Sequence, residues 1–342
     1  MKYACVLGLT ALVLATSIRA DEQTIVLFGN FRGSLNAIDD PRCGAQSCLE
    51  QDDHKGISFR NNASILGLRG TRTRDNKTAY FKYILRAHND EIFARGALST
   101  IIYQAGLKGA WGDLSLGVGS TPYKASGMAL DPFWDTSASA RGFDGPTVGF
   151  SDLTWGFTKN MVQWNSAQLW ETLTLSAAVV IDDTNADAHD INLGAQQRVG
   201  SVDVGLQFLS MSTSHPTAKS LRAGKAVRAW GRWSPEMPLT ISTSIERIDY
   251  KANRERSDLD PLQLHYALTL VYKRNMNRWA LALGRASAQE QPYLHGSGGS
   301  VGWFYQLMPG VELYALSSYN RRENGEPARR VSALGMLLNY AK

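Results

Sequence analysis

The sequence predicts an all-β fold, a closed antiparallel β-barrel of about sixteen strands that spans a membrane. Apolar and polar residues alternate with a period of two along most of the chain, and this spacing places successive side chains on opposite faces of a strand. Short and long connections alternate between these segments. Tryptophans stand beside several of the short connections, where a membrane interface would place them.

The first 20 residues have the features of a secretory signal peptide. Lys2 precedes the apolar run ACVLGLTALVLA, and SIRA and the polar DEQ follow it. We therefore expect cleavage before Asp21 and export of residues 21–342. Cleavage removes Lys2 and Arg19 and leaves 34 basic and 31 acidic residues, a net charge of +3. That charge is too small for a nucleic-acid-binding face, so no nucleic acid partner is expected.

Two cysteines remain after cleavage, Cys43 and Cys48, in the segment CGAQSC. A pair this close in an exported chain favours a disulfide that pins a loop. The alternative is a metal pair, which the lack of accompanying His or Cys ligands disfavours. We expect neither a metal site nor a cofactor.

The strands are expected wherever the alternation is sustained. In LQLHYALTLVYK, for example, every second residue is a Leu or Tyr, while Gln263, His265 and Thr269 fall on the other face. Segments of this kind are expected at residues 24–36, 57–70, 78–88, 99–109, 114–120, 157–166, 171–182, 189–199, 202–212, 225–234, 239–250, 262–274, 278–288, 299–307, 311–322 and 329–342.

The connections separate the barrel from its main alternative, a soluble β-sandwich. RVGS, SPEMP, NMNR and MPG are short, whereas 119–150, 213–224 and KANRERSDLD are long, and a transmembrane barrel has tight turns at one end and loops at the other. A sandwich also alternates, but its strands are usually shorter than the roughly 9–11 residues that cross a bilayer. Four tryptophans lie within a residue or two of a short turn: Trp111, Trp170, Trp233 and Trp279.

The surrounding solvent explains why the sheet must close. In hydrocarbon every strand N–H and C=O needs a partner, so an open sheet edge is not tolerated. A barrel of about sixteen strands is wide enough to leave an aqueous channel. The polar inward faces then line water.

Several segments resemble those of the general porins of Gram-negative outer membranes. TIVLFGNFRGSLNAI resembles the family's opening strand, with its LYG pattern written here as Leu27, Phe28 and Gly29. ASILGLRG resembles the second strand, and AGLKGAWGDLSLGVGSTPY resembles the fourth and fifth strands and the start of the third loop. The resemblance implies an outer-membrane location and a homotrimer of 16-stranded barrels. It also implies that the third loop, about residues 120–150, folds into the pore and narrows it.

The same resemblance implies a transverse electric field between acidic side chains of the third loop and basic side chains of the wall. We predict that Asp131, Asp135 and Asp144 form the acidic side. Alternation in the first three strands directs four basic side chains inward to form the basic side: Arg32, Arg69, Lys82 and Arg86. For each residue the alternative is a solvated charge away from the constriction. Further inward basic candidates are Arg198, Arg228, Arg232 and Lys273.

The chain departs from the family pattern at two places. Ile65 and Ile101 stand where relatives often carry constriction arginines, so a weaker field is expected. Lys342 stands where the family's final Phe would be, and Tyr340 is the last aromatic residue that keeps the alternation.

These features favour passive diffusion of ions and small hydrophilic solutes, with a weak preference for anions that follows from the basic excess. The alternative is a channel that prefers a sugar or organic acid, because Phe133 and Trp134 could stack on such a solute beside Asp131 and Asp135. The two aromatic residues could instead anchor the loop to the barrel wall. Outer-membrane lipid and lipopolysaccharide are further expected partners.

A barrel enzyme is disfavoured. Such an enzyme needs a nucleophile or an activated water oriented by a His and a carboxylate. The histidines of this chain are scattered along the sequence, and no nucleophile motif accompanies them.

Overall fold

The computed structural model describes residues 22–39, 56–62, 64–87, 98–139, 149–151, 153, 158–181, 189–212, 224–250, 262–288, 296–322 and 328–341. The signal peptide, Cys43, Cys48, Asp144 and Lys342, which the sequence-based interpretation names, fall outside these residues.

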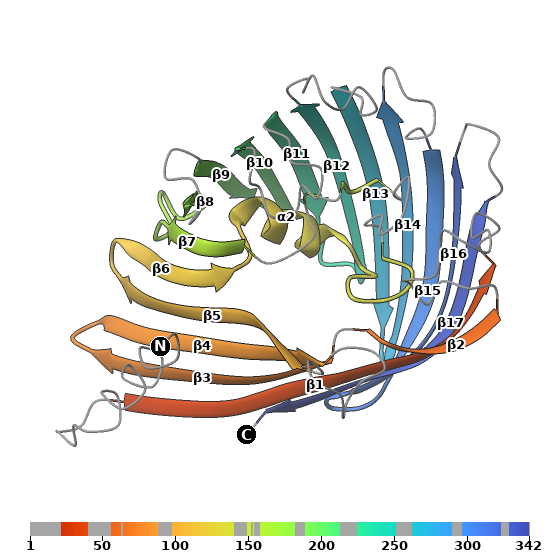
Figure 1. Cartoon of the computed structure of the whole chain (residues 1–342), viewed down its shortest axis with the longest axis horizontal. Helices are drawn as coiled ribbons and strands as arrows, with labels where there is room; N and C mark the ends of the chain where they lie inside the picture. Colours follow the sequence, from red (N-terminus) through yellow and green to blue (C-terminus); the bar gives the residue numbers. More distant parts are fainter. Residues whose placement is uncertain are drawn as a thin grey trace, which may run out of the picture.

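The described strands form one sheet that closes into a ring (Figure 1). From β3 to β17 each strand pairs antiparallel with the next one along the chain, β2 and β3 both pair with β1, and β1 closes the ring by pairing with β17. The strands are β1 (Glu22–Asp39), β2 (Gly56–Asn61), β3 (Ile65–Arg74), β4 (Lys77–Ala87), β5 (Leu98–Gly109), β6 (Gly112–Gly119), β7 (Thr158–Asn165), β8 (Leu173–Ile181), β9 (His189–Val199), β10 (Val202–Met211), β11 (Gly224–Trp233), β12 (Leu239–Tyr250), β13 (Leu262–Arg274), β14 (Asn277–Ala288), β15 (Gly296–Met308), β16 (Val311–Arg322) and β17 (Arg329–Ala341).

The predicted barrel of sixteen strands is confirmed, because β2 and β3 occupy a single place in the ring. Both pair with β1, β3 along Glu22–Asn30 and β2 along Gly33–Ile38. The alternation predicts one continuous strand over 57–70, whereas in the structure β2 ends at Asn61 and β3 begins at Ile65. The interruption lies beside Arg32, whose backbone N–H donates to Ser64 Oγ at 2.9 Å.

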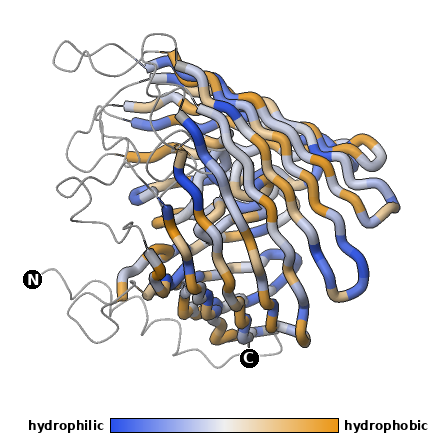
Figure 2. Tube along the Cα trace, turned by 90° about the vertical axis from the view of Figure 1, so that its right-hand side faces the viewer, coloured by the Kyte–Doolittle hydropathy of each residue, from blue (hydrophilic) through white to orange (hydrophobic). Residues whose placement is uncertain are grey.

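The alternation places apolar side chains outside, as predicted. Leu27, Phe31 and Leu35 of β1 are 48%, 43% and 52% exposed. Residues paired across the sheet share its outer face, since Leu27 pairs with Leu68 and Leu68 with Tyr83. Figure 2 shows the resulting mixture of hydrophobic and hydrophilic positions along each strand. The outer face is apolar and suited to contact with hydrocarbon, and the polar side chains point into the lumen.

Aromatic side chains lie near the end of the barrel that carries the tight turns. The rings of Tyr272 and Trp279, on either side of the β13–β14 turn, are 5.7 Å apart. Trp303 and Tyr305 of β15 stack at 6.0 Å. The four tryptophans singled out from the sequence are all exposed. This distribution is the aromatic girdle expected at a membrane interface.

One helix is described, α2 (Pro122–Leu130), and it stands inside the ring of strands (Figure 1). Among the residues that the structure describes, no helix is both long enough and apolar enough to cross a membrane. Buried apolar residues gather where the segment containing α2 meets the wall. The two largest buried apolar clusters of the described residues therefore include residues of the connection between β6 and β7.

Candidate pore constriction

The segment after β6 leaves the barrel wall and enters the lumen. Thr121 starts the helix α2, because its side-chain oxygen accepts a hydrogen bond from the backbone N–H of Lys124 at 3.2 Å. Pro122 follows at the first helical position, where its missing N–H costs nothing. The helix packs against β8, β9 and β10. The long connection predicted from the sequence thus has local signals that fold its first part as a helix.

A buried ion pair fixes the start of α2 to the wall. Arg228 of β11 and Glu246 of β12 are paired across the sheet, with 3.0 Å between the guanidinium and the carboxylate. Their side chains are 0% and 1% exposed. Arg228 also donates to the backbone carbonyl of Tyr123 at 2.7 Å and lies over the Tyr123 ring. A buried pair of charges is tolerated only with such additional hydrogen bonds.

Glu246 links the two ends of the inward segment. It accepts hydrogen bonds from the Tyr123 hydroxyl at 2.5 Å and from the Ser151 hydroxyl at 2.6 Å. Tyr123 stands at the start of the segment and Ser151 near its return to the wall. Asn192 of β9 adds an acceptor for the Tyr123 backbone N–H at 3.1 Å. One carboxylate therefore holds both ends of the segment against the same strand.

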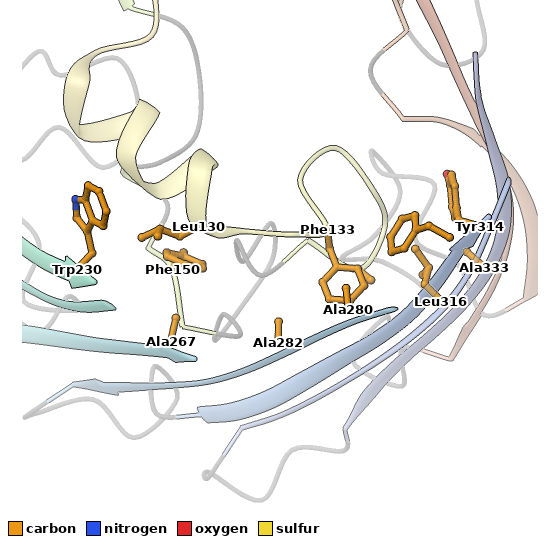
Figure 3. Packing of buried hydrophobic residues seen from close by; sticks show 12 residues of the cluster. Leu130, Phe133, Phe150, Trp230, Ala267, Ala280, Ala282, Tyr314, Leu316 and Ala333 are labelled. Carbon is orange, nitrogen blue, oxygen red and sulfur yellow. The ribbon is translucent and has the colours of Figure 1, made fainter. Parts of the chain in front are cut away.

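The residues after α2 are held by an apolar cluster. Phe133 is fully buried and packs 6.1 Å from the ring of Phe304. Small wall residues make room for it, and Ala280 and Ala282 are buried in the same cluster (Figure 3). A ring with no exposed surface cannot stack on a solute, so the suggested stacking role of Phe133 is wrong in this structure. Its burial is the anchoring arrangement that the sequence left as the alternative.

Asp131 also differs from its expected place on the acidic side of the pore. Its side chain is buried, with 5% of the residue's surface exposed. Its two carboxylate oxygens accept from the Phe133 backbone N–H at 2.9 Å and from the Ser139 hydroxyl at 2.7 Å. Asp131 thus organises the turn that follows α2. An aspartate with this local bonding pattern stabilises a turn and presents little charge to the lumen.

Asp135 stands beside the predicted basic wall. Its carboxylate is 3.3 Å from the Arg32 guanidinium, and both side chains are about one fifth exposed, 21% and 23%. Arg32 also donates to the Trp134 carbonyl at 3.3 Å. Arg86 is close enough to interact electrostatically with both Asp135 and Arg32. The acidic and basic groups here touch one another, so the segment contacts the wall at this point.

The other two predicted basic residues form a pair of their own. Arg69 of β3 and Lys82 of β4 are direct cross-strand partners on the inward face. Lys82 precedes Arg86 by four residues on β4, which is about 13 Å along a strand at 3.3 Å per residue. The four predicted basic residues therefore share one wall but divide into two groups. Arg32 and Arg86 lie at Asp135, and Arg69 and Lys82 lie nearer the tight turns.

The further inward basic candidates have different surroundings. Arg228 is enclosed in the anchor and does not face water. Arg198 pairs with Asp203 at 2.7 Å near the β9–β10 turn. Arg232 donates to the backbone carbonyl of Ala129. Lys273 is exposed close to the β13–β14 turn.

The buried pair of Arg228 and Glu246 was not predicted from the sequence. Alternation alone places Arg228 and Glu246 on inward faces, and Glu246 is the one carboxylate on that face of β12. A basic and an acidic residue on the inner face of adjacent strands is a signal that could have found the pair. Arg278 of β14 and Glu312 of β16 form an ion pair at 2.8 Å across the intervening strand β15, where Arg278 lies 3.5 Å from the centre of the Phe304 ring.

A closed barrel of sixteen strands with a lumen narrowed by an inward segment defines an outer-membrane channel. The chain belongs to the Gram-negative porin family, whose model matches residues 8–325. The family and the fold place the protein in the outer membrane and are those of channels.

Solved structures of porins have the same fold. The anion-selective porin from Comamonas acidovorans is 13% identical, and the match covers 93% of this chain and 100% of that chain with a TM-score of 0.77. The trimer form of OmpT from Vibrio cholerae is 12% identical over 94% of this chain and 100% of that chain, with a TM-score of 0.71. A Rhodopseudomonas blastica porin variant is also 12% identical, covering 93% and 100%, with a TM-score of 0.66. None of the curated proteins matches the sequence.

Proposed function

We propose that this channel lets ions and small hydrophilic solutes diffuse passively and prefers anions. The observation that carries the proposal is the pairing of Arg69 with Lys82. Two like charges directly opposite one another destabilise a sheet. Among the described residues no carboxylate forms an ion pair with either side chain. Two adjacent positive charges on the inner wall would attract anions into the lumen.

The acidic residues of the loop neutralise little of the positive charge of Arg69 and Lys82. The Asp135 carboxylate is held by Arg32, and the Asp131 carboxylate is enclosed in its own turn. On the neighbouring strands, Asp113 lies 3.5 Å from Lys108. The Comamonas acidovorans porin, which shares the fold, is described as anion-selective. We extend that preference to this chain on the basis of its own basic side chains.

The reversal potential of a planar bilayer in a KCl gradient tests the proposal. The wild type should pass chloride more readily than potassium. Replacing both basic residues, R69Q with K82Q, should lower the permeability ratio by about two- to fivefold, because an exposed charge interaction is worth about 0.5–1 kcal/mol. Arg72→Gln is the matched control, since Arg72 lies on the outer face of the same strand. A cation-selective wild type, or an unchanged ratio in the double variant, would contradict the proposal.

We also propose that the protein assembles as a homotrimer. OmpT from Vibrio cholerae, a protein with the same fold, has a trimer form. The outer face of β1 and β3 carries exposed apolar residues, including Leu27, Leu66 and Leu68, which could pack against a second copy. Single insertions into a bilayer should then close in three equal conductance steps. A particle with the mass of one chain in light scattering would oppose this proposal.

A channel that prefers one solute is the second candidate. With Phe133 buried, Trp134 is the remaining aromatic residue that could stack on a sugar or organic acid. It is only partly buried and precedes Asp135, which lies at the basic wall. Titration of sugars and organic acids during single-channel recording distinguishes the two candidates. Saturable block by one solute would favour the second, and its absence would favour a general pore.

A further inference from the structure

A groove of about 590 Å³ crosses four neighbouring strands, β11 to β14. Its floor is backbone, and two rows of side chains flank it. One row runs from Ala229 through Ile245 and Tyr266 to Arg285, residues that are paired in register from strand to strand. Three strand spacings give it a length of about 14 Å. The groove begins at an alanine and ends at an arginine.

The groove opens on the outside of the barrel. Ile245 and Tyr266 are 47% and 40% exposed, whereas their neighbours in sequence, Ser244 and Ala267, are buried on the lumen side. The second row contains Leu268 and Leu283, which are also exposed. This face of the barrel is the one that contacts lipid, so the groove lies against the bilayer.

The groove is apolar along most of its length. Thr243 contributes a hydroxyl to the second row, but that hydroxyl donates to the Ala267 carbonyl at 3.1 Å. Ala229 and Gly231 leave the far end open, because neither has a side chain large enough to fill it. A shape of this kind fits an extended hydrocarbon chain better than a rigid ring.

Further polar residues lie beside Arg285 at this end of the groove. Arg285 pairs with Ser297 of β15, and Ser297 pairs with Arg321 of β16. The two arginines are therefore two strand spacings apart, about 10 Å between backbones, a distance that their long side chains can bridge. Arg330 lies 5.7 Å from the Tyr319 ring on the adjacent strands. These residues form an outward-facing basic patch beside the groove.

The patch lies toward the end of the barrel that carries the long connections. Arg285 is three residues from the end of β14 at Ala288 and eight from its start at Asn277. An arginine on the lipid-facing surface is costly at the centre of the bilayer and nearly neutral at its edge. Tyr266 beside it is a residue typical of that edge. Arg285 and Arg321 therefore stand at the height of lipid headgroups, while the groove descends from them into the hydrocarbon.

We propose that this groove and patch bind a phosphorylated lipid of the surrounding bilayer, on the side of the long loops. An acyl chain lies in the groove, and the phosphate is held by Arg285 and Arg321 with Ser297 between them. Guanidinium groups match phosphate in charge and in geometry, since each can donate two parallel hydrogen bonds. A second copy of the chain would have to cover the same arginines with acidic groups. Charge complementarity thus favours the lipid.

Native mass spectrometry of the purified channel in non-ionic detergent tests the proposal. Dioleoyl phosphatidic acid and dioleoylglycerol have the same acyl chains, so they differ only in the phosphate. The wild type should retain phosphatidic acid on the order of tenfold more tightly, as expected for charge-assisted hydrogen bonds. R285Q combined with R321Q should abolish that difference. Ala229→Phe, which fills the far end of the groove, should weaken retention of both lipids.

Arg274→Gln is the matched control, because Arg274 is an exposed residue at the opposite, turn-side end of β13. It should leave both affinities unchanged. All variants lie outside the lumen, so unchanged single-channel conductance verifies that each barrel is folded. Equal retention of the two lipids by the wild type would overturn the proposal, as would an unaltered difference in R285Q/R321Q. A changed oligomeric mass in the Ala229→Phe variant would identify the groove as an interface between copies instead.

Discussion

Arg228 and Glu246 lie 3.0 Å apart beneath the inward helix, in a site that exposes at most 1% of either side chain. The pair is part of the barrel wall, yet its hydrogen bonds go to Tyr123 and Ser151 of the constriction segment. Two residues with almost no exposed surface thus connect the constriction segment to the wall.

Replacing Glu246 by Gln should loosen the constriction segment. The change leaves the Arg228 charge buried without its counter-ion, a situation that costs about 3–5 kcal/mol in proteins. The barrel ladder does not depend on this contact, so we expect α2 to detach while the barrel stays folded. Single-channel recordings should show a larger and noisier conductance.

The control for this experiment is the double variant R228M/E246L. It removes both charges together, and an apolar pair of similar volume is often neutral in stability. The single-channel current of this double variant should therefore be less noisy than that of the Glu246→Gln variant. A Glu246→Gln channel with wild-type conductance and noise would show that the buried pair does not hold the segment.

The contact between Arg32 and Asp135 predicts two opposite changes in selectivity. Asp135→Asn leaves Arg32 and Arg86 without the carboxylate, so the preference for anions should rise. Arg32→Gln leaves Asp135, so the preference should fall. Each change should be about twofold, because the pair is partly exposed and screened by water.

Reversal potentials in a KCl gradient measure both changes. Asp75→Asn is a suitable control, since Asp75 is an exposed residue in a tight turn beside Arg74. If the anion preference changed in the same direction in the Arg32 and Asp135 variants, the pair would not determine selectivity.

Phe133 and Trp134 are adjacent, but their substitutions should have different effects. Phe133→Ala removes a fully buried ring, which costs about 3–5 kcal/mol in a packed core, so the segment after α2 should become sensitive to protease. Trp134→Ala removes a partly exposed ring and should leave protease resistance intact. If Trp134 stacks on a solute, only its variant should lose concentration-dependent block. Equal protease sensitivity of the two variants would show that Trp134 also anchors the segment.

The disulfide between Cys43 and Cys48 stays a prediction, because both residues lie outside the described part of the chain. Trypsin would cut after Arg42 and after Lys55, so both cysteines fall in one peptide. An oxidised pair should resist alkylation until the peptide is reduced. Alkylation of both thiols without a reducing agent would show that the pair is free.

The strands and the orientation of their side chains could be read from the sequence because both depend on neighbouring residues. A period of two fixes which side chains share a face, and water on one side with lipid on the other makes that period visible. The inward positions of Arg32, Arg69, Lys82 and Arg86 followed from the same pattern. The break between β2 and β3 did not, since nothing in the local alternation marks it.

The conformation and position of the constriction segment depend on tertiary contacts. It has no period, and its partners are remote in sequence: Tyr123 meets Glu246, and Arg32 meets Asp135. Composition alone could not distinguish the buried Asp131 from Asp135 at the wall, although both are aspartates in one loop. The sequence by itself thus determined a closed barrel and which side chains of its strands face inward. Only the folded structure decided which charges of the loop reach the lumen, because burial depends on the surface against which the loop packs.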